Sequence, residues 1–276
     1  MLRLKKMVRH GNIKQVITGW CFMAEGDQWG IETLALTSKS LGCAGVELVA
    51  PEHWEVLKQN NLVCALTPSH RFVRGMNNPN HWPECMQKLE KAIDATAAAG
   101  FPNVITFTGF SDTSGEENGS VVTAADGLKN CVEGYKKIVK KAENSKVTIV
   151  LEPLNTRATE TMKGHPGYQG DHVDYCLEIV KQVGSPNLRL LFDVYHIQIM
   201  DGDLIRRIHE LKEYIAHVQV AGNPGRGEID ASQEINYSAV MHALKDISYQ
   251  GYVGHEWIPT RDPMQGLKEA VKICDV

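Results

Sequence analysis

The 276-residue sequence predicts a single (β/α)8 barrel, an α/β fold whose active site lies at the C-terminal ends of its strands. Eight short runs of β-branched and apolar residues alternate with longer segments of helical periodicity. Several of these runs are almost continuously hydrophobic, which is typical of parallel strands covered on both faces. The competing doubly wound sheet usually carries a G-x-G-x-x-G pattern after its first strand, and the segment 20–26 has none.

The expected strands are, in chain order, the segments 15–20, 45–49, 62–67, 103–108, 147–152, 188–193, 214–219 and 252–256. Between them, the apolar positions of 86–99 and 128–142 recur with helical spacing, so we expect helices there. Asp201 and Asp203 are suitable capping residues for a helix that includes Ile205.

The chain shows no linker and no change of composition, so we expect one domain over residues 1–276, with residues 1–12 as an N-terminal extension. Seven widely spaced cysteines without a C-x-x-C pair indicate reduced thiols, and therefore a cytoplasmic protein. No apolar run reaches the length of a transmembrane helix, and polar residues follow the basic N-terminus where a signal peptide would be apolar.

The charge balance argues against a nucleic-acid partner. The net charge is −4 and the pI is 6.3, whereas a duplex-binding domain is normally strongly basic. The densest basic run lies within 136–141 and is interpreted as the solvated face of a helix. We therefore expect a small-molecule substrate and neither nucleic acid nor membrane as partner; an assembly of identical copies stays open.

Polar side chains follow four consecutive strands at the point where each strand ends. Strands five to eight end at Glu152, Asp193, Gln219 and Glu256. Carboxylates crowded on an apolar rim repel each other and lose solvation, and a bound cation removes that cost. Three carboxylates and an amide oxygen suit one divalent metal ion, Mg²⁺ or Mn²⁺, and also Co²⁺.

Other side chains near the strand ends are weaker candidates. Glu47 near the end of strand two and His70 after strand three are candidate substrate-binding residues, although each also suits a structural role. His217 lies two residues before Gln219, so strand alternation puts it on the same face one layer deeper, whereas His255 points away from the interior. Both histidines are expected to be structural.

Aromatic residues at two strand ends leave a similar choice open. Trp20 and Trp257 suit either an apolar wall of a pocket or packing at the rim of the barrel.

A family resemblance rests on the segments 151–155, 192–198, 217–220 and 254–257, which read LEPLN, FDVYHIQ, HVQV and GHEW. With the aspartates at 201 and 203, they resemble the hydroxypyruvate isomerase branch of the xylose isomerase-like TIM barrels. The resemblance covers essentially the whole chain, and the DVYHIQ stretch is its most specific part.

The resemblance implies roles for the residues at the barrel rim. It implies that Glu152, Asp193, Gln219 and Glu256 hold one divalent metal ion, and that the two glutamates also transfer protons as catalytic residues. It further implies that His196 and Arg226 contact substrate oxygens. An arginine in this loop is suited to bind a carboxylate bidentately.

The expected reaction is isomerisation of a small hydroxy-keto acid, with hydroxypyruvate giving tartronate semialdehyde as the leading case. Moving a carbonyl along such a molecule removes a proton beside it and passes through a cis-enediolate. The metal ion stabilises the charge on the two adjacent oxygens, and two glutamates serve as base and acid.

Two departures from the family pattern affect the expected substrate. Hydroxypyruvate isomerases typically follow the loop arginine with His-Glu-Pro, whereas Arg226 is followed by Gly227, Glu228 and Ile229. The loop 155–171 is also long and is a candidate lid.

Three other functions stay open beside this one. A ketose 3-epimerase, or an isomerase of a larger keto acid, would use the same fold and metal, but family epimerases typically have His at the position of Gln219. An apurinic-site endonuclease shares the barrel, but that branch typically has a histidine-rich three-zinc site that includes a D-x-H pair. Residues 230–232 of this chain read Asp-Ala-Ser instead, which argues against that function. A barrel without catalysis has no reason to retain four metal-binding residue types at consecutive strand ends.

Overall fold

The computed structural model describes residues 10–25 and 28–276 and contains one eight-stranded sheet in the order β3-β2-β1-β8-β7-β6-β5-β4. All neighbouring strands are parallel. The strands are β1 (Lys14–Thr18), β2 (Gly45–Glu47), β3 (Val63–Cys64), β4 (Asn103–Thr106), β5 (Thr148–Leu151), β6 (Leu188–Asp193), β7 (Ile215–Val220) and β8 (Tyr252–His255).

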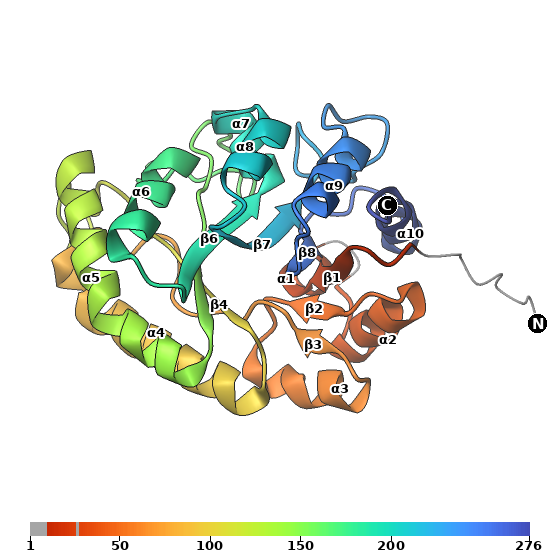
Figure 1. Cartoon of the computed structure of the whole chain (residues 1–276), viewed down its shortest axis with the longest axis horizontal. Helices are drawn as coiled ribbons and strands as arrows, with labels where there is room; N and C mark the ends of the chain where they lie inside the picture. Colours follow the sequence, from red (N-terminus) through yellow and green to blue (C-terminus); the bar gives the residue numbers. More distant parts are fainter. Residues whose placement is uncertain (1–9, 26–27) are drawn as a thin grey trace, which may run out of the picture.

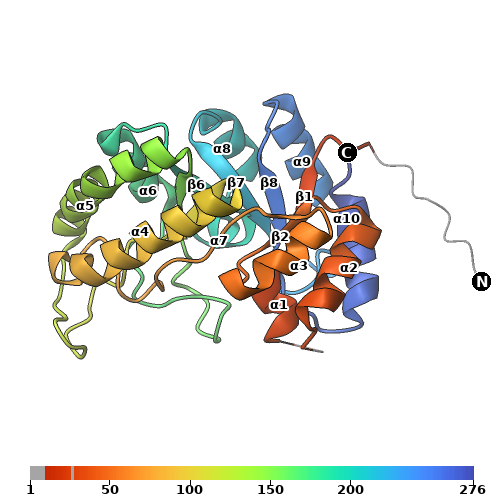
Figure 2. The same cartoon turned by 90° about the horizontal axis from the view of Figure 1, so that it is seen from below.

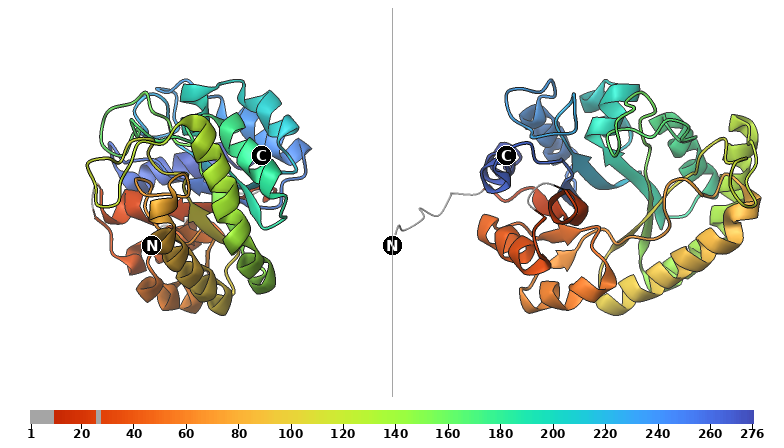
Figure 3. Two further views of the ribbon diagram at one scale, coloured as in Figure 1. Left: turned by 90° about the vertical axis from the view of Figure 1, so that its left-hand side faces the viewer. Right: turned by 180° about the vertical axis from the view of Figure 1, so that it is seen from behind.

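Helical segments follow every strand, and in Figure 1 the helices α2 to α10 surround the strands. The helices are α1 (Gly19–Met23), α2 (Ile31–Leu41), α3 (Trp54–Gln59), α4 (Trp82–Ala99), α5 (Ala124–Ser145), α6 (Val173–Val183), α7 (Val194–Met200), α8 (Leu204–Glu210), α9 (Tyr237–Asp246) and α10 (Pro263–Ile273), with 3₁₀ turns η1 (Pro51–His53) and η2 (Pro79–His81). The same ring is seen from behind in Figure 3. The expected (β/α)8 barrel is confirmed.

The barrel closes between β3 and β4 through a single bridge, from Thr67 to Val104. The Thr67 amide donates to the Asn103 carbonyl at 2.9 Å, and the Ile105 amide donates to the Thr67 carbonyl at 3.0 Å. Elsewhere adjacent strands pair through ladders of two or more residues. We call this bridge the seam of the barrel.

All eight expected strands are present, and 188–193 coincides with β6. The two expected helices begin earlier than predicted, at Trp82 and Ala124. Asp203 stands at the start of α8 as expected, but its side chain makes no capping hydrogen bond and pairs with Arg206 instead. With φ at 53°, its left-handed backbone differs from the extended conformation typical of a capping residue.

Most of the apolar core lies between the sheet and the helices, where α4 buries Leu89 and Ile93. A second, smaller cluster includes Leu66, Ile105 and Leu191 from the strands and the segments that extend them. In contrast, the buried side chains contributed by β2 and β7 include polar and charged groups, which the next subsection describes.

The ends of the described chain lie against each other. The backbone amides of His10 and Gly11 donate to the carboxylate of Asp275, both at 3.0 Å, and the Asn12 side chain donates to the Val276 carbonyl. Of the expected extension 1–12, residues 1–9 lie outside the described residues. Within the described ranges, no helix combines the length and apolar character needed to cross a membrane.

Candidate active site

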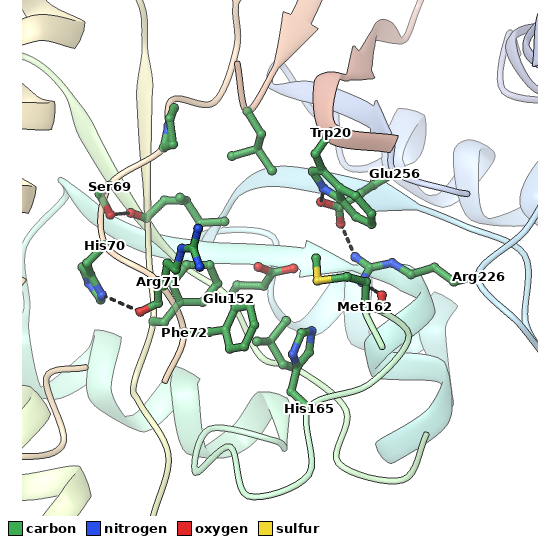
Figure 4. A pocket seen from close by; sticks show the side chains of 15 residues that line it. Trp20, Ser69, His70, Arg71, Phe72, Glu152, Met162, His165, Arg226 and Glu256 are labelled. Carbon is green, nitrogen blue, oxygen red and sulfur yellow. Dashed lines mark hydrogen bonds and ion pairs between the residues drawn. The ribbon is translucent and has the colours of Figure 1, made fainter. Parts of the chain in front are cut away.

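A cavity of about 290 Å³ opens where the strands end and their loops begin. Its lining comes from residues after seven of the eight strands, and Figure 4 shows the labelled side chains around it. The loop after β5 lies at the same end of the molecule as α1, which follows β1 directly (Figure 2). The cavity therefore occupies the C-terminal face of the barrel, where (β/α)8 enzymes carry their active sites.

Three carboxyl groups from consecutive parts of the rim are buried at this face: Glu152, Asp193 and Glu256. Asp193 ends β6 and caps α7, because its Oδ1 accepts the amides of Tyr195 and His196 at 2.8 and 3.1 Å. These two hydrogen bonds to the start of the helix fix the position of the carboxylate.

The other two carboxyl groups differ in their partners. Glu256 accepts the indole N–H of Trp20 at 2.9 Å on Oε1 and a guanidinium N–H of Arg226 at 2.5 Å on Oε2. By contrast, Oε1 of Glu152 is buried without a hydrogen-bond partner among the described residues. Glu152 thus retains a free acceptor at the cavity wall.

Burial raises the pKa of Glu152, Asp193 and Glu256, since desolvation penalises their charged forms. Repulsion from the neighbouring carboxylates raises the pKa of Glu152 and Glu256 further, while the guanidinium of Arg226 opposes the shift in all three. One arginine does not balance three carboxylates, so a further cation would stabilise their charged forms.

Gln219 and Glu47 form the floor below these carboxyl groups. The Gln219 Nε2 donates to Oε1 of Glu47 at 2.8 Å, which leaves Oε1 of Gln219 buried and without a partner in the described part of the chain. Glu47 also accepts from Thr18 and from Nε2 of His217, both at 2.6 Å, and is fully buried. The amide is therefore held with its nitrogen toward Glu47 and its oxygen unused.

The carboxyl group of Glu47 is surrounded by hydrogen-bond donors. Burial alone would raise its pKa, but the charge of His217 and the hydrogen bonds from His217, Thr18 and Gln219 hold the pKa below its ordinary value. Glu47 does not line the cavity.

His196 has a defined tautomer. Its Nδ1 accepts the backbone N–H of Asn155 at 3.0 Å, so this nitrogen carries no proton. Burial lowers the pKa of His196 well below its usual range, which keeps the ring neutral with its proton on Nε2. Nε2 is buried 3.7 Å from Oδ2 of Asp193 and has no hydrogen-bond partner within residues 10–25 and 28–276. It is an unused donor in the site.

The side chains present suit a hard divalent cation. Ligand atoms of Glu152, Asp193 and His196 lie within 4.8 Å of one another. Unused oxygens on Glu152 and Gln219 match the oxygen ligands that Mg²⁺ and Mn²⁺ prefer. Because Nε2 of His196 bears the proton, this histidine is better suited to donate to a ligand oxygen than to bind the cation.

Arg226 crosses the site from the loop between β7 and α9. Its backbone has a left-handed φ of 54°, which is uncommon for a residue with a side chain and occurs preferentially at functional sites. Besides Glu256, its guanidinium donates to the Met162 carbonyl at 2.6 Å and lies 5.3 Å from the Trp20 ring. Both terminal nitrogens are thus engaged, and the expected bidentate grip on a substrate carboxylate stays a prediction.

His70 lines the cavity, as a substrate-binding residue would, but both ring nitrogens are already bonded. Its Nδ1 donates to the carbonyls of Arg71 and Arg74 at 3.0 and 3.1 Å. Its Nε2 therefore lacks a proton and accepts from the Thr106 hydroxyl at 2.9 Å.

The remaining sequence candidates take the following places. His217 lies below Gln219 against Glu47, and His255 donates from Nε2 to Gln15 at 2.8 Å, so both are internal hydrogen-bonding groups. Trp20 lines the cavity, whereas Trp257 is fully buried and packs edge-on against the Phe22 ring.

Several lining residues were missed by the sequence interpretation. These are mainly apolar or cationic residues of the βα loops: Arg71, Phe72, Phe107, Leu154, Met162 and His165. Met162 and His165 belong to the expected lid loop 155–171, and the first four lie in the segments that follow β3, β4 and β5. Position after a strand was the available signal, and it had indicated only polar residues and the two tryptophans Trp20 and Trp257.

Comparisons with known proteins agree with this architecture. The model of the xylose isomerase-like TIM barrel family matches residues 37–275, and the chain belongs to that family. It is 35% identical over 179 residues to a putative hydroxypyruvate isomerase of Mus musculus, covering 65% of this chain and 62% of that protein.

Two further curated relatives match shorter segments. A putative hydroxypyruvate isomerase of Homo sapiens is 42% identical over 43% of this chain and 41% of its own length. The hydroxypyruvate isomerase of Escherichia coli is 31% identical over 44% and 45%. The matched segments thus span between about two fifths and three fifths of these relatives.

Solved structures share the fold at lower identity. An AP endonuclease, family 2, from Brucella melitensis superposes with a TM-score of 0.78 at 24% identity, over 92% of this chain and 97% of that chain. A D-psicose 3-epimerase in the presence of D-fructose gives a TM-score of 0.69 at 15% identity, over 95% and 90%. At these identities the likeness shows the barrel alone.

Proposed function

We propose that this protein is a divalent-metal-dependent isomerase of a small hydroxy-keto acid, with the conversion of hydroxypyruvate to tartronate semialdehyde as the leading reaction. The buried cluster of Glu152, Asp193 and Glu256 beside the unused oxygen of Gln219 carries this proposal. The curated relatives named hydroxypyruvate isomerase support the choice of substrate.

Glu152, Asp193, Gln219 and Glu256 would hold the metal ion, which when bound supplies Lewis-acid stabilisation of negative charge on substrate oxygens. Glu152 and Glu256 directly follow β5 and β8, and both line the cavity. One removes the proton beside the substrate carbonyl, and the other returns a proton to the neighbouring carbon.

Other side chains orient the substrate and exclude water. His196 would donate its Nε2 proton to a substrate oxygen, and Arg226 would hold Glu256 in position through their 2.5 Å bond. Met162 and His165 cover the cavity from the loop 155–171, and Phe72 and Phe107 add apolar surface. Apolar side chains that exclude water strengthen the charge interactions inside the site.

The alternative is a ketose 3-epimerase, or an isomerase of a larger keto acid, on the same metal site. The shared barrel of solved 3-epimerases supports it at the level of fold, and relatives named 2-oxo-tetronate isomerase support a longer acid. We favour a keto acid over a ketose because Gln219 stands where family epimerases typically have histidine, and the relatives named hydroxypyruvate isomerase favour the smaller acid. The buried cysteines suit a cytoplasmic enzyme.

The test is turnover of hydroxypyruvate by chelator-treated protein, before and after addition of Mg²⁺, Mn²⁺ or Co²⁺. We expect activity only after metal is restored. Ketoses of four to six carbons and a four-carbon 2-keto acid are assayed in parallel, and a preference for either would favour the alternative.

Single variants test the two-glutamate mechanism. Glu152→Gln and Glu256→Gln should each lower kcat by about 10² to 10⁴, the usual contribution of a general acid or base. Glu90→Gln on the exposed side of α4 is the control and should keep full activity. Near-normal turnover in both site variants, with metal content unchanged, would contradict the mechanism.

A further inference from the structure

Within residues 10–25 and 28–276, Arg71 is the one arginine whose guanidinium makes no hydrogen bond or ion pair. It follows the β3 end of the seam, in a stretch from Pro68 to Phe72 that lines the cavity. The residue is exposed, so its charge is available at the mouth of the site.

Arg226, the other arginine of the lining, is in the opposite situation. It is buried, and its terminal nitrogens bind Glu256 and the Met162 carbonyl. A substrate carboxylate would compete with Glu256 for this guanidinium. Arg71 has no such internal anion to displace.

The two arginines lie on opposite sides of the cavity in the view of Figure 4, with Glu152 between them. The histidines of the lining do not supply a second cation there, because burial lowers the pKa of both His70 and His165. The lining of the same cavity includes Phe72, Ile105 and Phe107, whose apolar surfaces reduce competition from water for a carboxylate bound inside it.

We propose that Arg71 binds the carboxylate of the substrate and thereby makes the site select hydroxy-keto acids over neutral ketoses. This inference rests on the proposed function and adds the residue that determines its substrate class. The guanidinium presents paired N–H donors that match a carboxylate, and such charge-assisted bonds are about twice as strong as neutral ones.

Binding of a non-reacting pair of probes tests this without relying on turnover. D-Glycerate carries the carboxylate, and glycerol is its uncharged counterpart. Both are titrated calorimetrically into the Mn²⁺-supplemented wild-type protein and into Arg71→Met, Arg71→Lys and the control Arg206→Met. Arg206 is exposed on α8, pairs with Asp203 and does not line this cavity.

We expect Arg71→Met to weaken D-glycerate binding about tenfold to hundredfold, the usual range for a hydrogen-bonded charge. Arg71→Lys should show an intermediate loss, because it keeps the charge but not the paired donors. Glycerol binding should be equal in all four proteins, and Arg206→Met should match the wild type. Arg71 holds no internal partner, so the melting temperature of the variants should be unchanged.

In the kinetic arm, Arg71→Met should raise KM for hydroxypyruvate more than it lowers kcat and should improve relative turnover of neutral ketoses. Unchanged D-glycerate affinity in Arg71→Met would overturn the inference. If the wild type turned over no keto acid but lost D-glycerate affinity on Arg71→Met, the proposed reaction would be wrong and the carboxylate site would stand.

Discussion

His70 lies in the cavity wall, and both of its ring nitrogens are hydrogen-bonded to neighbouring groups of the protein. Its Nδ1 donates to two backbone carbonyls of the loop after β3, and its Nε2 accepts from Thr106 at the end of β4. These bonds join the two sides of the seam. His70 therefore holds the loop that carries Arg71, whatever else it contacts when substrate is bound.

The protonation of His70 gives a stability prediction. Burial lowers its pKa below the ordinary value near 6.5, so the unfolded chain takes up a proton that the folded protein does not. The stabilising contribution of the neutral ring is complete above about pH 6.5 and is lost as the pH falls toward the folded-state pKa.

The wild type and His70→Gln should therefore differ less in their free energy of unfolding at pH 5 than at pH 7, by up to about 2 kcal/mol. Urea unfolding of both proteins at the two pH values measures it. All other titrating groups are shared by the two proteins and cancel. An equal difference at both pH values would show that His70 titrates alike in the folded and unfolded states.

Glu47 shows what strand alternation can and cannot predict for a single residue. Alternation correctly placed His217 on the same face as Gln219, one layer deeper. Glu47 was expected among substrate-binding residues, and that role stays untested, but the structure puts it on the same buried floor. The depth of a side chain within a barrel depends on how far each strand is shifted against its neighbours, which one sequence does not reveal.

At the scale of the elements, Gly254 of β8 lies against the side chain of Glu47 from β2. A Cβ built there would lie 2.2 to 2.5 Å from the carboxyl atoms of Glu47, too close for any side chain. The glycine thus leaves the space in which Glu47 binds Gln219 and His217.

Gly254→Ala should accordingly lower the free energy of unfolding by about 1 to 3 kcal/mol, as overpacking of a core does. Chemical denaturation measures this. Gly115→Ala in an exposed turn is the control, because a Cβ built there meets nothing within 4 Å, and it should change stability little. Equal stability of both variants would mean that Glu47 can move at no cost.

The elements themselves could be predicted better than their ends. All eight strands were identified because hydrophobic runs between polar turns are a strong signal. The start of α5 was missed by four residues, although Thr123 and Asp126 form a reciprocal cap with bonds of 3.1 and 2.7 Å. The sequence contains this cap, but the apolar periodicity that we followed begins only at Leu128.

For the molecule as a whole, the proposed binding of a metal ion to the crowded carboxyl groups would couple metal binding to stability. The cluster exists only when β5, β6 and β8 are assembled, so a cation that binds it stabilises the folded state alone. At a free Mn²⁺ concentration of 100 times Kd, the gain is about 2.7 kcal/mol.

Thermal unfolding should therefore shift upward with added Mn²⁺ in the wild type. Asp193→Asn should abolish the shift, because the amide removes a charge yet can still accept the two N–H groups at the start of α7. A shift of the same size in both proteins would indicate that Mn²⁺ binds elsewhere.

The acidic residues of the site could be predicted from the sequence because parallel strands deliver their C-terminal ends to one rim. The part of the cavity lined by loop residues could not be predicted, because the positions of Arg71, Phe72 and His165 depend on how the loops fold over the barrel. Nothing in the spacing of these residues distinguishes them from surface loop residues. Only the assembled loops show that they share a cavity.

The seam between β3 and β4 also divides the evolutionary freedom of this barrel. The proposed metal-binding residues lie within or directly after the strands of the continuous ladder from β5 to β8, whereas Arg71 and Phe72 follow the strand beside the single bridge. Substitutions in the segment 68–72 can alter which molecules enter while leaving the support of the carboxylates intact. A lineage with this architecture can exchange one substrate for another without rebuilding its reactive centre.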